Sequence, residues 1–370
     1  MARHQGDVLA AARLRSRGVT APPGSRRSYI DVARGIAVLL MIEAHTLDAW
    51  TRVTSKTGIP FRDATILGGF AAPLFLWLAG LGVVLSATRT LQRTGSHGAA
   101  VDTVVRRGLE IFVLAFLFRL QAFVVSPGGA PVALFRVDIL NVMGPAIALA
   151  GAICVVRSAW WRTFAFAIAA AAIAMVTPIM RVAPFVDALP TWVQWYFRPA
   201  GEYTTFTFFP WMGFVLAGAA VGSLIADSDE RSANGLHVAF AIIGAALVAL
   251  GFVTAARPTI YAASSFWTSS PTWFSIRVGV MMIALAALHY APRAPHLARL
   301  GRHSLFVYWI HVELVYGYAS WLWRHRLPLW GTAIAYALFC YAMYRAIDLR
   351  DALVERWHRY RAAEVQLTTT

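Results

Sequence analysis

The residues best suited to chemistry in this sequence are ionisable side chains inside apolar segments. On a helix, at about 100° per residue, four of them share one arc of about 100°: Asp31, Arg34, His45 and Asp48. Arg34 and His45 are three turns apart, about 16 Å along the axis. Arginine binds phosphates, and histidine transfers protons near neutral pH. The stripe therefore fits one long ligand with an anionic end and a reactive group, and a coenzyme A thioester has this form.

A purely structural interpretation of the same stripe is also open. Asp31 and Arg34 would then form a salt bridge at the membrane interface, and His45 would hydrogen-bond to a neighbouring helix. Glu43 lies on the opposite side of the helix. Spacing alone does not decide between the two interpretations.

Other polar residues lie within or beside apolar segments, where an ionisable side chain needs a partner, a water-filled cavity or a function. They are Arg119, Asp138, Asn141, Arg277, His311 and Glu313. We expect Arg119 to pair with Glu43 or Asp138. Asp138 and Asn141, three residues apart at the outer start of a helix, are candidate contacts for an acceptor substrate.

Two further candidates lie later in the chain. His311 is expected at a depth comparable with that of His45, either in a cavity with two histidines or satisfied by Tyr308. Glu202, beside Tyr203 and a threonine-rich stretch, is expected either to contact an acceptor or to begin a solvated helix.

The composition of the chain indicates a membrane protein. Of its 370 residues, 58% are hydrophobic and only 14% are charged, against about 25% charged in an average soluble domain. The net charge of +15 would suggest nucleic acid in a soluble chain. Here the cations lie between apolar runs, where they mark membrane topology, so we expect a lipid bilayer and no nucleic acid as partner.

Apolar segments long enough to cross a bilayer recur along the whole chain. Lipid gives the backbone no hydrogen-bond partner and the alternation of a β-barrel is absent, so these segments are predicted to be helices. The expected fold is an all-α, polytopic transmembrane bundle with about ten spans. The candidate spans are 30–50, 66–87, 108–125, 137–156, 160–177, 205–225, 236–255, 272–290, 303–323 and 329–347.

The expected organisation is a disordered cytoplasmic tail over 1–28, a transmembrane domain over 29–347 and a basic cytoplasmic C-terminal tail over 348–370. With the N-terminus inside, the inner segments hold 21 Arg and the outer segments 10 Arg or Lys. The positive-inside rule therefore predicts that both termini are cytoplasmic. The 32 Arg against one Lys indicate a GC-rich genome and favour a bacterial inner membrane.

The cysteines indicate neither a disulfide framework nor a metal site. Cys154 and Cys340 both lie in apolar segments, without a His or Cys at metal-ligand spacing. We expect packing roles for them and no metal.

Several short motifs resemble a known family when they are taken in order. The sequence is similar to the transmembrane acyltransferase superfamily, and within it to the branch of heparan-α-glucosaminide N-acetyltransferase. The resemblance covers most of residues 28 to 345. The motifs are Asp31-Val-Ala-Arg34-Gly35 followed by an apolar run and His45, then Gly68 to Gly80, Arg106-Arg107-Gly108, Phe135 to Asn141, Phe209 to Gly213, and Leu300 to His311.

The resemblance implies transfer of an acetyl or related acyl group from cytosolic acyl-CoA to a sugar or glycan across the membrane. In the animal lysosomal relatives the slot of His45 looks like an Asn, with the catalytic His about three turns later, where this chain has Lys56. An Arg followed eleven residues later by His is closer to the bacterial O-acyltransferase pattern. That pattern puts the general base on His45.

Roles for the other residues follow from the chemistry of acyl transfer. Asp48, one turn beyond His45, is expected to orient the imidazole, and an acyl-histidine intermediate is also open. His311 is the second catalytic candidate, as donor to the developing oxyanion or as a ligand of the acceptor. The phosphates of acyl-CoA are expected to bind at Arg34, Arg106 and Arg107.

Other functions remain open at this stage. Intramembrane Arg, His and carboxylate groups also build proton-coupled transporters and flippase-like permeases, although no inverted repeat is visible here. A receptor or scaffold would leave the stripe of Arg34 and His45 without a purpose. The sequence leaves open the acceptor, N- or O-transfer and the acyl chain length. It also leaves open the oligomeric state, and a homo-oligomer is one of the states that it allows.

Overall fold

The computed structural model describes residues 27–125 and 130–368. Within these ranges the chain is helical, and its extended contacts are two isolated bridges, Thr51 with Leu327 and Val137 with Thr204. The predicted all-α class is confirmed. The tail predicted over 1–28 lies outside the described residues except for its last two positions.

The ten apolar segments of the sequence all fall on helices. The helices are α2 (Ser28–Trp50), α3 (Gly58–Gly68), α4 (Ala71–Thr94), α5 (His97–Val125), α6 (Ile139–Ile153), α7 (Ala159–Val182), α8 (Thr191–Gln194), α9 (Phe208–Asp227), α10 (Ala233–Ala255), α11 (Pro271–Tyr290), α12 (Pro295–Arg302), α13 (Ser304–Tyr316) and α14 (Leu329–Thr368). The predicted span 303–323 is shorter than expected, because Gly317 ends α13 and a 3-10 turn at Tyr318–Ser320 follows.

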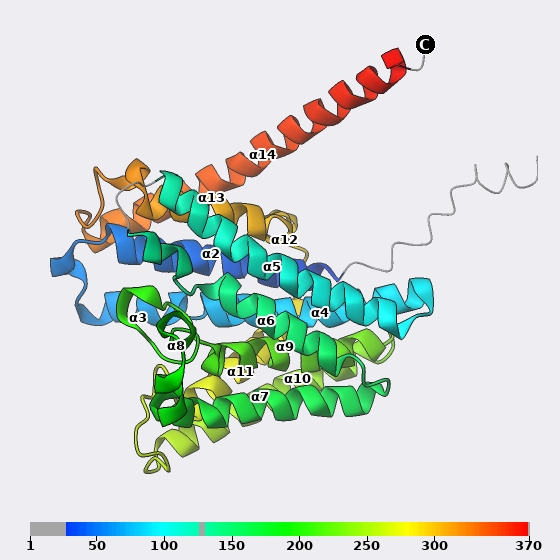
Figure 1. Cartoon of the computed structure of the whole chain (residues 1–370), viewed down its shortest axis with the longest axis vertical. Coiled ribbons are helices and arrows are strands. Elements are labelled where there is room, and N and C mark those ends of the chain that lie inside the picture. The colour runs from blue at the N-terminus through cyan, green and yellow to red at the C-terminus, as the bar shows by residue number, and fades with distance from the viewer. Residues whose placement is uncertain (1–26, 126–129, 369–370) are drawn as a thin grey trace, which may run out of the picture.

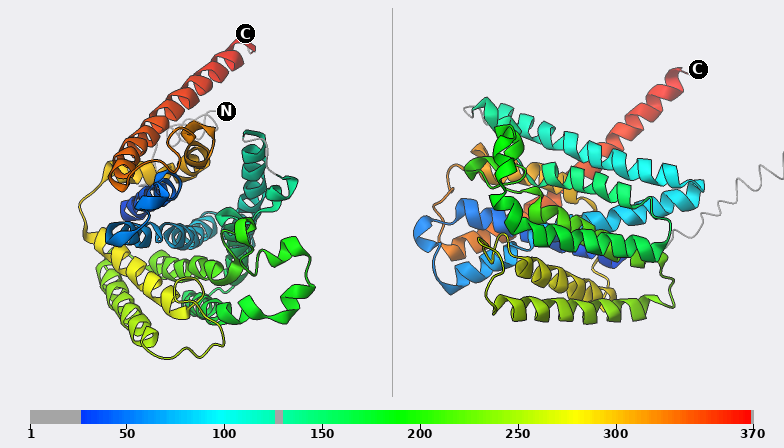
Figure 2. Two further views of the ribbon diagram at one scale, coloured as in Figure 1. Left: turned by 90° about the vertical axis from the view of Figure 1, so that its left-hand side faces the viewer. Right: turned by 60° about the horizontal axis from the view of Figure 1, so that its bottom comes forward.

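Most of these helices run side by side along a common axis (Figure 1). α4 packs against α9 and also contacts α2, α5 and α6, while α10 pairs with α11 and α7 packs on α9. Viewed from the end, α5 and α6 lie on one side of the bundle and α2, α12 and α14 on the other, with α4 between them (Figure 2). Side chains of α2, α4, α5 and α6 line one common cavity between these helices.

Glycines bring the paired helices close together. In each of four pairs, a Cβ on the glycine of either helix would collide with the partner's backbone or side chains, so a larger residue would force the axes apart. The pairs are α2 with α12 (Gly35, Gly301), α4 with α9 (Gly80, Gly218), α5 with α6 (Gly108, Gly144) and α10 with α11 (Gly244, Gly279). The first pair joins two motifs from opposite ends of the sequence and fixes the start of α2.

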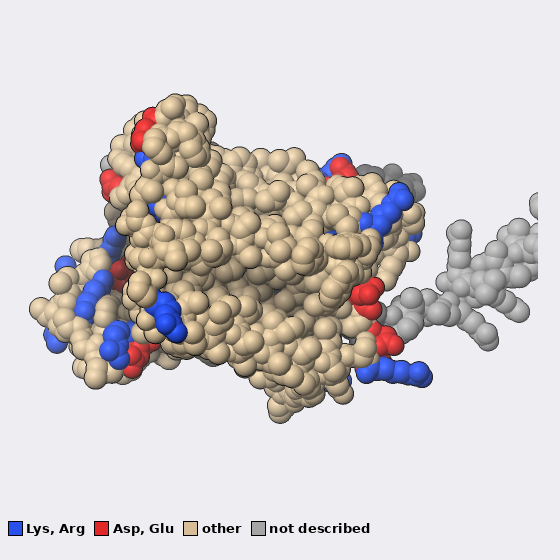
Figure 3. Space-filling model, turned by 90° about the horizontal axis from the view of Figure 1, so that it is seen from below, with Lys and Arg blue, Asp and Glu red and all other residues tan. Residues whose placement is uncertain are grey.

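The surface and the helix lengths both fit a membrane. Charged side chains gather at two opposite ends of the face in Figure 3, and the broad zone between them is uncharged. In the part of the chain that the structure describes, six helical segments are long and apolar enough to cross a bilayer: Gly58–Thr94, His97–Val125, Ala159–Val182, Phe208–Asp227, Ala233–Ala255 and Pro271–Tyr290. The predicted count of ten spans is not confirmed, since α6 and α13 have only 15 and 13 residues.

The start of α2 and the second half of α14 lie at the same end of the bundle. α12 packs on α2, and Arg299 of α12 donates to Asp348 at 2.5 Å and to Asp351 at 2.9 Å on α14. The Arg299 guanidinium holds the pKa of Asp351 below its usual range. The boundary predicted at residue 347 falls inside one continuous helix, α14. This helix leaves the bundle beyond its ion pairs with Arg299 (Figure 1).

Candidate active site

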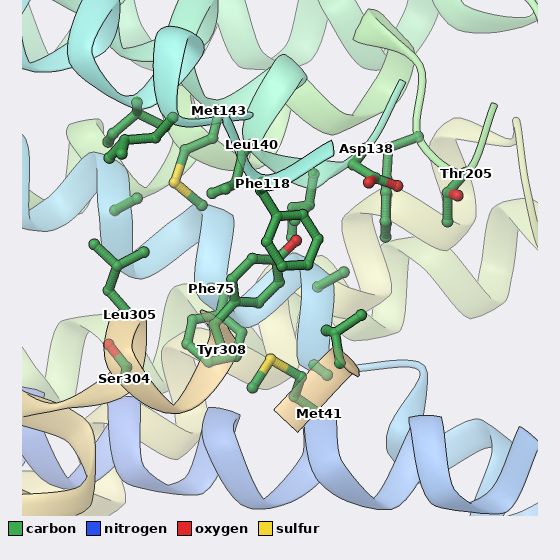
Figure 4. A pocket seen from close by; sticks show the side chains of 18 of the residues that line it. Met41, Phe75, Phe118, Asp138, Leu140, Met143, Thr205, Ser304, Leu305 and Tyr308 are labelled. Carbon is green, nitrogen blue, oxygen red and sulfur yellow. The ribbon is translucent and has the colours of Figure 1, made fainter. Parts of the chain in front are cut away.

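A cavity of about 1420 Å³ runs through the interior between α2, α4, α5, α6 and α13. This is larger than the 300–1,000 Å³ of most ligand pockets. Figure 4 shows Ser304 and Leu305 toward one side of it, Asp138 and Thr205 toward the other, and the rings of Phe75, Phe118 and Tyr308 between. The middle of the cavity is therefore apolar and its two ends are polar.

His45 lies on the wall of this cavity and contacts His311 from α13. The two rings are nearly parallel, with 4° between their planes, and His45 Nδ1 lies 2.8 Å from His311 Nε2. The other ring nitrogen of His311, Nδ1, faces the backbone carbonyl oxygens of Val307 and Tyr308, each at 2.9 Å. The His45 imidazole on the wall is thus hydrogen-bonded to the His311 imidazole, and His311 is hydrogen-bonded to the backbone of α13.

The two histidines differ in their access to the cavity. His311 is fully buried and lies behind His45 instead of on the wall. It therefore does not line the cavity in which the reacting carbonyl and the acceptor were expected to meet it. Its backbone partners are the carbonyls of Val307 and Tyr308, one turn earlier on α13, and Tyr308 is the residue that the sequence offered as a partner for His311.

Asp48 lines the same cavity but its carboxylate is bound elsewhere. One oxygen accepts a hydrogen bond from the Tyr316 hydroxyl at 3.0 Å, and the other lies 3.4 Å from Lys56 Nζ. The Tyr316 ring packs edge-on against His45, with centroids 5.5 Å apart. Asp48 therefore reaches His45 through Tyr316, and the hydrogen-bond partner of His45 is His311.

Basic residues line one end of the cavity. Arg34 contacts Asp31 at 3.2 Å, so the salt bridge considered for the sequence is present, and Arg34 also lines the wall. Gly82 of α4 makes room for this guanidinium, because a Cβ there would lie 2.7 Å from Arg34 Nη2. The fold thus brings the predicted anion-binding residue into the cavity.

Two further arginines of the predicted phosphate site line the same cavity from α5. Arg106 pairs with Asp102 at 3.3 Å and Arg107 with Glu110 at 3.1 Å, and all four side chains are exposed. Exposed pairs of this kind contribute about 0–1 kcal/mol. A phosphate can therefore replace these carboxylates at little cost.

The opposite end of the cavity holds an ion pair between Arg119 and Asp138, which confirms one of the two partners expected for Arg119. Asp138 also caps α6, and its backbone N–H donates to Asn141 Oδ1 at 2.9 Å. Asn141 is buried and its amide reaches the Tyr196 hydroxyl at 3.4 Å, so it supports the cap instead of lining the cavity. Glu202 is exposed on a 3-10 turn, away from the wall.

Two arginines at this end were not predicted as site residues. Arg136 lines the cavity and donates to Thr205 Oγ1 at 3.1 Å, and Arg324 lines it while donating to the carbonyl of Tyr316 at 2.9 Å. Arg136 belongs to the motif from Phe135 to Asn141, and this motif was the sequence signal that could have identified it as a site residue. Arg324 is one of the ten cations of the predicted outer segments, and the sequence gives no sign that its loop lies over the cavity.

Arg277, which lies in an apolar segment of the sequence, contacts the junction of α3 and α4. Its guanidinium donates to the carbonyl of Gly69, where α3 passes into α4, and lies between the rings of Phe70 and Trp273 at 4.7 and 4.3 Å from their centroids. A helix end inside the membrane leaves carbonyls without partners, and this side chain satisfies one of them. Arg277 therefore stabilises the junction of the two helices.

These features define a class of protein: a polytopic helical membrane protein whose interior cavity has basic residues at both ends and an imidazole on its wall. A family model described as heparan-alpha-glucosaminide N-acetyltransferase, catalytic, matches residues 26–261. The chain belongs to this family, as the motifs predicted, and is an acetyltransferase-type membrane enzyme. No curated protein matches the chain in sequence. The matched range includes Arg34, His45 and Asp138, and it ends before α11, so His311 lies beyond it.

Proposed function

We propose that the protein moves an acetyl or related acyl group from cytosolic acyl-CoA to a sugar or glycan on the far side of the membrane. The observation that carries this proposal is the single cavity that joins Arg34, Arg106 and Arg107 at one end, His45 on its wall and the ion pair of Asp138 at the other end. Two substrates that approach from opposite sides would meet at the imidazole.

Basic residues at the first end suit the phosphates of acyl-CoA. Arg34, Arg106 and Arg107 would bind them, since a planar guanidinium forms paired hydrogen bonds with phosphate oxygens. The pantetheine arm would then lie along the apolar middle of the cavity and bring the thioester to His45. The volume and the polarity of the cavity fit such a co-substrate.

His45 would act first as a base and then as an acid. It takes the proton from the acceptor hydroxyl or amine while the acceptor oxygen or nitrogen bonds to the thioester carbonyl carbon. The bond from that carbon to sulfur then breaks, and His45 returns the proton to the departing sulfur. Asp138, paired with Arg119, would face the acceptor at the other end of the cavity.

The orientation of the protein is part of this proposal. The excess of arginine in the inner segments supports cytoplasmic termini, a bacterial inner membrane and acyl-CoA at the end with Arg106 and Arg107. We also retain ten crossings, in which α2, α6, α13 and the first half of α14 complete the six long apolar segments. A buried cavity tolerates the polar residues of α2 at membrane depth.

The proposal is tested by acyl transfer in isolated membranes. Membranes containing the protein are given acetyl-CoA labelled in the acetyl group together with cell-envelope glycans, and label in the glycan fraction is measured. We expect transfer above that of membranes without the protein, and retention of the purified protein on immobilised coenzyme A. If neither acyl transfer nor retention on coenzyme A is found, and the protein instead supports proton-coupled uptake of a solute into vesicles, the permease is favoured.

A further inference from the structure

We propose that His311 is a positioning residue that fixes the tautomer of His45, with the proton on Nδ1 and the lone pair of Nε2 presented to the cavity. This inference rests on the proposed role of His45 as the base. The contact that carries it is the hydrogen bond of 2.8 Å between His45 Nδ1 and His311 Nε2, in the described part of α2 and α13.

The backbone of α13 determines which nitrogen of His311 carries hydrogen. His311 Nδ1 lies 2.9 Å from the carbonyl oxygens of Val307 and Tyr308. A carbonyl oxygen only accepts hydrogen bonds, so Nδ1 must be the donor. In a neutral imidazole the second nitrogen is then an acceptor, and His311 Nε2 therefore presents a lone pair to His45.

Burial keeps His311 in its neutral form. Its side chain is 0% exposed. A second proton would create an imidazolium that is enclosed by protein, and an isolated buried charge is costly. His45 Nδ1 must therefore supply the hydrogen of the contact, because His311 Nε2 has none to give.

The tautomer of His45 follows from this chain of donors. With its proton on Nδ1, neutral His45 has its lone pair on Nε2, at the other side of the ring. Among the described residues, His45 Nε2 has no hydrogen-bond partner, and the side chain lines the cavity. The nitrogen that can accept a proton is thus the nitrogen that faces the substrates.

His311 also keeps this arrangement through the reaction. When His45 Nε2 accepts the acceptor's proton, the positive charge is stabilised by the bond from Nδ1–H to the lone pair of His311 Nε2. When Nε2 gives the proton to the coenzyme A sulfur, the same tautomer returns, and no proton needs to leave His311. A carboxylate in this position would orient the ring equally well but would bury a negative charge.

The tautomer is tested by solid-state NMR of the protein labelled with ¹³C,¹⁵N-histidine and reconstituted in lipid bilayers. The signals of His45 are assigned by their loss in His45→Gln. We expect at neutral pH a protonated Nδ1 and an unprotonated Nε2 on His45. A protonated Nε2 on neutral His45 would overturn the inference.

The kinetic test uses three variants. His311→Gln retains a side-chain oxygen that can accept from His45 Nδ1–H, whereas His311→Leu retains bulk without an acceptor. We expect His311→Leu to lower kcat about 10–100-fold, the usual effect of losing a group that orients a functional imidazole, with KM for acetyl-CoA unchanged. His311→Gln should recover most of kcat.

His237→Leu is the matched control, because His237 is also buried and its Nδ1 lies 2.7 Å from the carbonyl of Ala233, four residues earlier. It should leave kcat unchanged. Equal losses in His311→Gln and His311→Leu, or a loss in KM only, would overturn the positioning role.

Failure of this inference is distinguishable from failure of the proposed function. If His45→Ala retains transfer, the base is elsewhere, and the NMR tautomer still tests the pairing with His311. If His45→Ala is inactive while His311→Leu keeps full kcat, the proposed function stands and the positioning role is wrong.

Discussion

Two pairs of neighbouring histidines among the described residues differ in what their ring nitrogens face. In the first, His45 and His311 meet edge to edge through a hydrogen bond of 2.8 Å, and His45 lines the cavity. In the second, His237 and His289 stack face to face, with centroids 3.7 Å apart, beside Tyr29 at the end of the bundle where α2 begins. His237, like His311, has Nδ1 on a backbone carbonyl four residues earlier.

The difference teaches that residue type and burial do not make an imidazole reactive. Stacked rings direct their nitrogens away from each other, and His289 Nε2 contacts Asn234 Oδ1 at 3.0 Å instead of His237. In an edge-to-edge pair, the nitrogen that carries hydrogen on one ring instead determines which nitrogen carries hydrogen on the other ring. Of the two pairs, only the first combines this with a wall position in the cavity, so we expect proton transfer at the first pair and not at the second.

The comparison is tested most strongly by removing one histidine of each pair. His45→Ala should lose acyl transfer by about 10²-fold or more, the usual contribution of a positioned general base, while the protein still inserts and binds acyl-CoA. His237→Ala should retain transfer. The measurement is transfer of labelled acetyl in membranes with matched amounts of each variant. Near wild-type transfer by His45→Ala would contradict the mechanism, even though family membership would be unaffected.

A smaller effect is expected at the arginine that accompanies each pair. Arg34 lines the cavity, whereas Arg27 donates to the carbonyls of Ile225 at 2.5 Å and Ser228 at 3.4 Å near the second pair. Arg34→Lys keeps the charge but loses the planar fork, so the affinity for acetyl-CoA should fall about tenfold, the equivalent of about one charged hydrogen bond.

Arg27→Lys is the control for this substitution and should leave the affinity for acetyl-CoA unchanged. Titration of the purified proteins with acetyl-CoA measures both. If the two variants bind equally well, Arg34 serves only as the partner of Asp31.

The smallest effect is expected from the second pair itself. His289→Phe keeps a flat ring against His237 and loses the contact with Asn234, so the free energy of unfolding should fall by about 1 kcal/mol or less. Transfer should be unchanged. Thermal unfolding in detergent and the transfer assay check the two statements. Loss of transfer with an intact fold would give the second pair a role that its stacking does not explain.

The structure uses several candidate residues differently from what the sequence predicted. Asn141 has the expected place beside Asp138, but it completes a helix cap and contacts Tyr196. Glu202 lies exposed on the 3-10 turn Gly201–Tyr203, as in the second of the two expectations for it, although Thr205 three residues later lines the cavity. A side chain next to a site in sequence reaches that site only if the local turn directs it there, and composition does not encode that direction.

The sequence by itself determined the helical class, the membrane setting, the family and the stripe that places Arg34 and His45 three turns apart. These follow from local rules, because hydropathy selects spans and the helical period fixes angle and depth along one element. The tertiary structure decided that the partner of His45 is His311, 266 residues away, and that Asp48 binds Tyr316 instead. Periodicity gives the side of a helix but not the neighbour that packs there, and that neighbour is set by close packing of helices such as the contact of Gly35 with α12.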